Sequence, residues 1–174
     1  MGLSIAISGA IMVFTMIYVM MSFPSLLDDT ANVSRSSSEM SNTLNYILHT
    51  NIRISNLVDT HGTNPATFSV TNTGNTILWN YKKFDVIITY QQNGNGNTIL
   101  TEALQYSNSC TGLDSDHWCI SSITNDLTHP GMLDPNEIIN VEAKVLQATL
   151  TNGNFILNFG TDNGILDTNS VKIT

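Results

Sequence analysis

Charged residues are scarce in this sequence, and basic residues are the scarcest class. Lysine and arginine number 6 among 174 residues, against 14 acidic residues, which gives a formal net charge of −8. Nucleic acids and anionic lipid surfaces attract proteins through clusters of basic side chains. The composition therefore argues against a nucleic-acid partner, and it leaves asparagine, threonine and serine to make most of the surface polar.

No charged residue occurs within residues 1–27, and this stretch is strongly apolar. A helix of about 25 residues reaches ~37 Å, which exceeds the ~30 Å hydrocarbon layer of a bilayer. A cleaved secretory signal would have a basic leader, a shorter apolar core and a small-residue cut site, and none of these is found. We therefore predict a retained single-pass transmembrane helix over residues 3–27, with the remaining chain outside the cell.

Small and hydroxyl residues recur at helical spacing within this predicted span. They are Ser4 and Ser8, Ala6 and Ala10, and Gly9. Such residues allow a second helix to approach closely in lipid, so the pattern favours helix–helix packing. The alternative is a lone span, because isolated membrane helices also tolerate serine and glycine.

Glycine and proline are missing from residues 25–49, where apolar residues recur every seven positions at Leu26, Val33, Met40 and Ile47. A stripe this narrow suits a helix that leans on one partner, which would be another subunit. The alternative is a flexible serine-rich tether. We predict a helical stalk, so that residues 1–50 form anchor and stalk. Asn32 begins the chain's one Asn-x-Ser/Thr triplet and is a possible N-glycosylation site.

After Asn51 the apolar residues alternate with period two, which is typical of β-strands. Asparagine and glycine separate the runs, as in 93–97, where Asn-Gly favours a hairpin. The predicted strands are 52–57, 67–71, 77–81, 84–91, 98–106, 117–121, 138–150, 155–159 and 170–173. The chain is therefore predicted to be mainly β with one long N-terminal α-helix. Residues 51–174 would form an extracellular immunoglobulin-like β-sandwich.

Cysteine occurs twice, at Cys110 and Cys119. In an oxidising exterior, two cysteines nine residues apart predict a disulfide that closes the intervening loop and contributes about 2–3 kcal/mol. Metal binding by Asp114, Asp116 and His117 is a weaker alternative, because no zinc or calcium spacing surrounds them. Two unpaired thiols are the third possibility.

Sequence signatures of catalysis are missing. No Gly-x-Ser-x-Gly turn and no glycine-rich phosphate loop occur. The four histidines are dispersed along the chain, and their surroundings favour loop or surface positions. We therefore expect no enzymatic activity, no catalytic residue and no cofactor.

Four short segments resemble one known family. They are the uncharged opening Met1–Ile11, then Val70–Gly74 before a strand, Phe84–Ile88, and Leu133–Glu137 ahead of the long strand. Together with the anchor, stalk and β domain, they resemble the archaellum protein F family, an accessory component of the archaeal flagellar motor. More broadly, they resemble the architecture of archaellins and type IV pilins.

The resemblance implies a stator role. In that family the β domain lies between the membrane and the surface layer, binds the surface-layer protein, self-associates and joins a sister protein of the G type. A membrane-anchored stator-like protein that supports swimming is thus the leading expectation. A filament-forming subunit whose N-terminal helices bundle into a core is the alternative. The sequence lacks the basic pair before glycine that filament subunits carry, which favours the accessory protein. An anchored receptor or carbohydrate-binding module is a third possibility.

Overall fold

The computed structural model describes residues 2–62, 64–94 and 98–174, with side chains described from residue 7 onward except those of residues 23–30. The chain divides into two compact units, Met1–Asn45 and Tyr46–Thr174. The first unit is helical, and the second contains all the strands together with the last turn of the helix.

Helix α1 (Gly2–His49) is continuous over 48 residues, as the lack of internal glycine and proline from residue 25 onward predicts. Its large apolar side chains between residues 7 and 21 are all more than half exposed. Within the described part of the chain, no helix combines the length and apolar character that crossing a membrane requires. The predicted transmembrane span at residues 3–27 is therefore not supported. Residues 3–6 and 23–27 of that span lie outside the described side chains.

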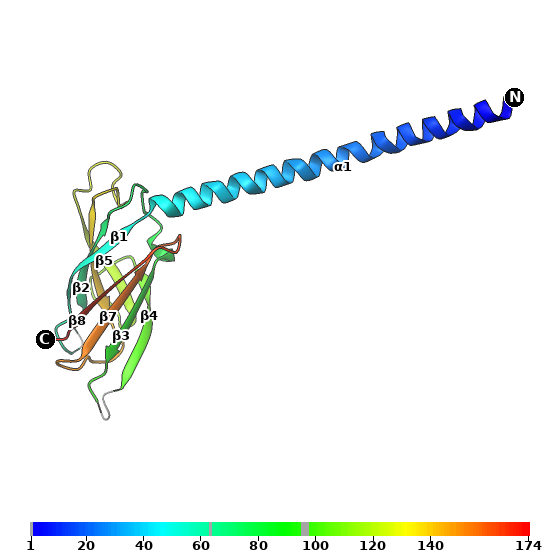
Figure 1. Ribbon diagram of the computed structural model, residues 1–174. Helices are drawn as coiled ribbons and strands as arrows, with labels where there is room; N and C mark the ends of the chain where they lie inside the picture. The colour runs from blue at the N-terminus through cyan, green and yellow to red at the C-terminus, as the bar shows by residue number, and fades with distance from the viewer. Residues whose placement is uncertain (1, 63, 95–97) are drawn as a thin grey trace. The chain divides into compact units, whose positions relative to one another are not determined.

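The described residues of the β domain form eight strands, and Figure 1 shows their arrangement. Their order across the sheet is β1-β2-β6-β5-β4-β3-β7-β8. The strands are β1 (Ile52–Val58), β2 (Ala66–Asn72), β3 (Asp85–Gln91), β4 (Ile99–Ser107), β5 (His117–Thr124), β6 (Ile138–Lys144), β7 (Asn154–Gly160) and β8 (Leu166–Lys172). All neighbours pair antiparallel except β4 and β5, which pair in parallel over three residues.

The two halves of this sheet form a nearly closed, barrel-like sandwich. One layer is β1-β2-β6-β5 and the other is β4-β3-β7-β8, joined along one side by the β4–β5 pairing. On the opposite side β1 and β8 lie next to each other without a ladder. The predicted mainly β fold with a long N-terminal helix is confirmed, whereas the immunoglobulin-like assignment is not.

The core lies between the two layers and follows the alternation of the sequence. Phe159 on β7 is fully buried and makes edge-to-face contacts with three rings, those of Phe68, Phe84 and Trp118, at centroid distances of 5.8–5.9 Å. These rings come from both layers of the sandwich, so Phe159 packs the two layers against each other. Aromatic pairs of this geometry add to the hydrophobic stabilisation of the buried area.

Three predicted strands are wrong in extent, and one of them, predicted at 170–173, corresponds to β8, which begins earlier at Leu166. Residues 77–81 contribute an isolated bridge, Leu78 to Leu133, followed by the 3₁₀-helix η1 (Tyr81–Lys83). The predicted strand 138–150 ends at Lys144, because Leu146 and Gln147 leave the ladder. Their backbone N–H groups instead donate to Glu102 and to the Tyr90 hydroxyl, at 2.9 and 3.1 Å.

Candidate functional site

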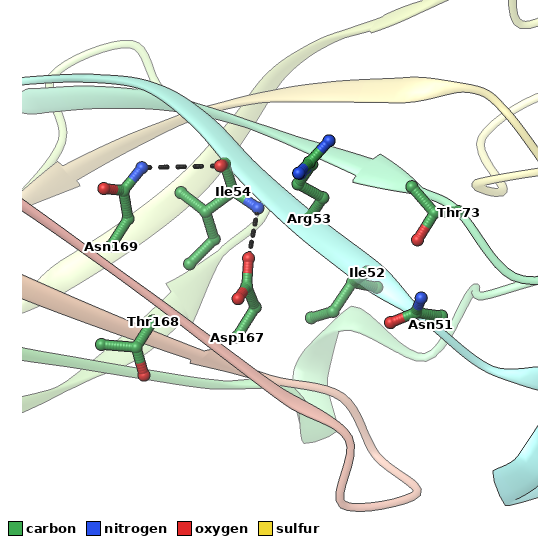
Figure 2. A pocket seen from close by; sticks show the side chains of 8 residues that line it. All are labelled: Asn51, Ile52, Arg53, Ile54, Thr73, Asp167, Thr168 and Asn169. Carbon is green, nitrogen blue, oxygen red and sulfur yellow. Dashed lines mark hydrogen bonds between the residues drawn. The ribbon is translucent and has the colours of Figure 1, made fainter.

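The unpaired side of the sandwich, where β1 meets β8, forms a polar depression. We call it the seam; it is lined by Asn51, Ile52, Arg53, Ile54, Thr73, Asp167, Thr168 and Asn169 and has a volume of about 510 Å³. Figure 2 shows Asp167 and Asn169 reaching from β8 toward Ile54 on β1. The seam is therefore a gap between two strand edges, bridged by side chains.

Backbone parity explains which groups face the seam. Thr73 N–H donates to Asn51 C=O, so odd-numbered residues of β1 bond to β2 and the peptide groups of Ile52 and Ile54 point away from it. On β8, Ile173 N–H donates to Gly153 C=O, so odd-numbered residues bond to β7. The peptide groups of the even-numbered residues on β8, such as Thr168, therefore point into the seam.

Two β8 side chains occupy part of this gap. The Asp167 carboxylate accepts a hydrogen bond from Ile54 N–H at 2.6 Å. The Asn169 amide donates to Ile54 C=O at 3.5 Å and accepts from Ser170 N–H at 2.7 Å. The Asn169 side chain thus bonds one edge with its NH₂ and the other with its oxygen, as the peptide group of an intervening strand would.

Other backbone N–H and C=O groups that face the seam have no side chain bonded to them. Across the described residues, no hydrogen bond reaches the seam-facing N–H and C=O groups of Ile52 or Thr168. Arg53 also lines the seam, is exposed, and forms no ion pair with any described residue. The seam therefore combines free backbone donors and acceptors with the cation of Arg53 and the carboxylate of Asp167.

A second feature is the end of α1 within the β domain, at His49 to Asn51, which we call the root of the helix. Asn75 N–H donates to His49 C=O at 2.7 Å, and Gly74 N–H donates to Asn51 C=O at 3.0 Å. A Cβ at Gly74 would lie 2.5 Å from both the Asn51 nitrogen and the His49 oxygen, so only glycine fits. Buried Thr50 also accepts a hydrogen bond from the Asn163 amide. The last helical turn is therefore fixed to the domain by its backbone.

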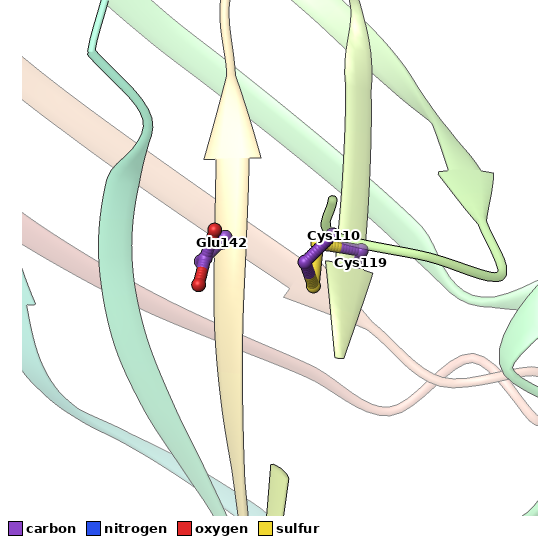
Figure 3. Close-up of side chains that lie close together, drawn as sticks. All are labelled: Cys110, Cys119 and Glu142. Atoms are coloured by element: carbon purple, nitrogen blue, oxygen red, sulfur yellow. A yellow bond between two sulfur atoms is a disulfide. The ribbon is translucent and has the colours of Figure 1, made fainter. Parts of the chain in front are cut away.

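The predicted disulfide is present, with Cys110 and Cys119 joined at an S–S distance of 2.05 Å. Glu142 lies beside it, as Figure 3 shows, because Glu142 is the direct cross-strand partner of Cys119. These three residues are the one group in the described part of the chain that brings three metal-ligating atoms close together. Because the sulfurs are bonded to each other, neither is available as a thiolate ligand. Asp114, Asp116 and His117 form no such group.

Titratable groups elsewhere act as structural partners. Tyr90 donates its hydroxyl to Glu102 at 2.7 Å, and burial is the main cause that raises the pKa of Tyr90. Asp59 is buried and accepts a hydrogen bond from Thr149 at 2.8 Å; burial raises the pKa of Asp59. His129 and Asp134 lie 2.9 Å apart. We find no nucleophile–base pair among these groups.

The predicted contact residues of the helix lie along α1. Ser8, Gly9 and Ala10 are exposed, as are Val33, Met40 and Asn32, and Ile47 is half-buried. Ser4, Ala6 and Leu26 fall outside the described side chains. Helix–helix packing by the small residues, contact of the stalk residues with another subunit and glycosylation of Asn32 all remain predictions.

Sequence reasoning missed the seam. The available signal was β8 itself, where Asp167 and Asn169 occupy the inward-facing positions that a strand closing a sandwich normally fills with apolar residues. The polar inward face marks β8 as a strand that meets a gap and has no ladder partner on that side.

Comparison with known proteins finds likeness in structure alone. No family model matches the sequence, and no curated protein is similar to it in sequence. The archaellum periplasmic stator protein FlaG from Sulfolobus acidocaldarius matches with a TM-score of 0.50 and 16% identity over 70% of this chain and 99% of that one.

Two further solved structures are similar. The archaellum periplasmic stator protein complex of FlaF and FlaG from the same organism matches with a TM-score of 0.50 and 17% identity, over 69% of this chain and 87% of that one. The archaeal flagellum of Methanospirillum hungatei strain JF1 matches with a TM-score of 0.62 and 14% identity, over 100% of this chain and 94% of that one. At these identities the likeness is one of fold. It agrees with the archaellum resemblance drawn from the sequence.

Proposed function

We propose that this chain is a structural, non-enzymatic component of the archaellum machinery, acting as a stator-like protein that supports swimming. The observation that carries the proposal is the likeness of fold to archaellum proteins on both units of the chain. Two stator structures match about 70% of the chain, and a flagellar structure matches all of it, helix included. The dispersed titratable groups support a structural role.

The root of the helix supports a load-bearing role. Force applied along α1 would reach the sheet through the backbone bonds of His49 and Asn51 to the 74–75 turn and through Thr50 to Asn163. Several short hydrogen bonds loaded together resist separation better than a flexible linker, which would absorb movement. A protein that must hold position against a rotating part needs this kind of connection.

In this proposal the helix attaches the protein to the cell envelope and the β domain makes contacts outside. The stripe at Leu26, Val33, Met40 and Ile47 would pack against another subunit. The β domain would bind the surface-layer protein, a second copy of the chain and a sister archaellum protein. Support comes from the exposed apolar side chains of α1, which need a covering.

A filament subunit is the second candidate function. It is favoured by one observation, namely that the flagellar structure matches the whole length of the chain with the higher TM-score of 0.62. In that case α1 helices would bundle into a core, and their apolar side chains would be buried against one another.

Disruption of the gene in the source organism separates the two candidates. If the chain is stator-like, filaments still assemble but cells do not swim; if it is a filament subunit, filaments are missing. Complementation with the intact gene must restore swimming in either case. Normal filaments together with normal swimming would refute both proposals.

A second assay tests the proposed partner of the stator. The full-length chain, kept in detergent, is incubated with isolated surface-layer lattice and the lattice is sedimented. Co-sedimentation that is lost when the β domain is first unfolded supports surface-layer binding. Recovery of the chain in the supernatant at all lattice concentrations contradicts it.

A further inference from the structure

We propose that the seam between β1 and β8 is an acceptor site for an extended polypeptide strand supplied by a partner protein. The inference goes beyond the archaellum role and does not depend on it, because it rests on the edges of the two strands. A strand inserted there would bond to β1 on one side and to β8 on the other, and would complete the barrel.

The first support is the direction of the two edges. Following the pairings around the sheet, with one parallel step at β4–β5, β1 and β8 run in the same direction. One added strand can therefore be antiparallel to both neighbours, which is the more favourable pairing. A direct β1–β8 ladder would be parallel, and none is formed between Ile52–Val58 and Leu166–Lys172. Just beyond these strands Thr174 N–H donates to Asp59 C=O at 3.3 Å and His61 N–H donates to Thr174 C=O at 3.0 Å, so the seam is closed at that end and the added strand would lie alongside Ile52 to Val58.

The second support is the supply of unpaired peptide groups. Ile52 on β1 and Thr168 on β8 present N–H and C=O groups to the same depression, without partners among the described residues. Exposed strand edges are templates for pairing with another chain, and main-chain hydrogen bonds supply affinity when an extended peptide is added. The depression that these groups line has a volume of about 510 Å³.

The third support is the pair of side chains already in the gap. Asp167 and Asn169 bond the peptide groups of Ile54 and Ser170, which an inserted strand would otherwise bond. These side chains can rotate outward without breaking any ladder bond, because their own backbones pair with β7. They satisfy the edge groups while the site is empty and must be displaced when it is filled.

The chemistry of the occupant follows from the residues that flank the gap. Ile52 and Ile54 point into the core, so residues on the inward face of the added strand should be small and apolar. Arg53 points outward, is exposed and lacks a carboxylate partner. The fitting strand therefore alternates apolar residues with outward residues that include an aspartate or glutamate opposite Arg53.

A labelled synthetic peptide tests this proposal. The probe is a nine-residue peptide that alternates valine with aspartate and threonine, and binding to the full-length chain in detergent is followed by fluorescence anisotropy. The matched control peptide has the same side chains but carries an N-methyl group on every second residue. This group removes the N–H donors along one edge of the strand. We expect binding by the first peptide and at least a tenfold loss with the second.

Two protein variants locate the binding. Arg53→Glu should weaken binding by about fivefold, because the carboxylate of the peptide then meets a like charge. Lys83→Glu makes the same charge change on η1, outside the seam, and should leave binding unchanged. Hydrogen exchange should show new protection at the amides of Ile52 and Thr168 when the peptide is bound.

Any one of four results would overturn the proposal. One is equal binding of the plain and N-methylated peptides. Another is equal weakening by Arg53→Glu and Lys83→Glu. The third is a failure of the plain peptide to bind, and the fourth is protection that appears only on strands outside the seam.

Discussion

Helix α1 and the β domain differ in the exposure of their large apolar side chains. Between residues 7 and 21 every large apolar side chain of α1 is more than half exposed, from Ile17 at 51% to Met21 at 78%. In the β domain Phe155, Leu157 and Phe159 are fully buried. The β domain therefore contains the interactions that stabilise its own fold, whereas α1 exposes apolar side chains that its own helical unit does not bury.

The largest expected difference between the two regions comes from truncating a buried side chain. Phe159→Ala removes a ring that touches Phe68, Phe84 and Trp118, and should lower the free energy of unfolding of the β domain by about 3–5 kcal/mol. Met40→Ala on α1 should change it by less than about 0.5 kcal/mol. Urea denaturation followed by tryptophan fluorescence measures both. Similar losses from the two variants would show that the helix is packed in the isolated chain.

The disulfide contributes the next largest effect and acts within the β domain alone. Replacing both Cys110 and Cys119 by alanine opens a short loop and should cost about 2–3 kcal/mol of unfolding free energy. The helical circular dichroism signal at low denaturant should stay unchanged. A loss of helix in this variant would contradict the independence of the two regions.

A single type of substitution should have opposite signs in the two regions. Gly74→Ala places a Cβ 2.5 Å from backbone atoms at the root of the helix and should destabilise the domain by about 2 kcal/mol. Gly9→Ala adds a Cβ within α1, where nothing lies within 4 Å, and should favour the helix by about 1 kcal/mol. Thermal melts of the domain and of the helix, followed by circular dichroism, report each effect. Destabilisation of the helix by Gly9→Ala would indicate close packing there.

The smallest effect concerns a buried carboxyl of the β domain. Burial raises the pKa of Asp59, while the hydroxyl of Thr149 and the charge of His61 oppose this shift. Between the ordinary pKa and the raised one, the folded chain binds more protons than the unfolded chain, so stability falls as pH rises through that window. Asp59→Asn should lack this fall. Its stability relative to the parent chain should therefore increase with pH, and a difference that is constant with pH would contradict the assignment.

Much of the β domain was predictable because its signals are local. Alternating apolar residues predicted six strands close to their observed positions, and the separation of Cys110 from Cys119 predicted the disulfide. The strand predicted at 138–150 was too long. The side chains of Tyr90 and Glu102, which are far from residues 146–147 in sequence, accept hydrogen bonds from the backbone N–H groups of Gln147 and Leu146. The periodicity of apolar residues cannot predict these bonds.

The seam could not be predicted from local patterns, because it arises from closure of the sheet. Strand order decides that β1 and β8, at opposite ends of the domain sequence, face each other. Only then do Asp167 and Asn169 become bridging residues rather than ordinary surface polar groups. The heptad stripe of α1 was readable in the sequence, and the subunit predicted to pack against it stays a prediction.

The central claim is that one face of α1 is covered when the protein is in place. It is tested most directly by thiol labelling of Met40→Cys in intact cells with a membrane-impermeant maleimide, compared with labelling of the extracted chain. Asn42→Cys is the matched control, because position 42 lies on the opposite side of the helix and is also exposed. We expect both thiols to react in the extracted chain, and in cells Asn42→Cys alone to react. Equal labelling of the two positions in cells would contradict the account.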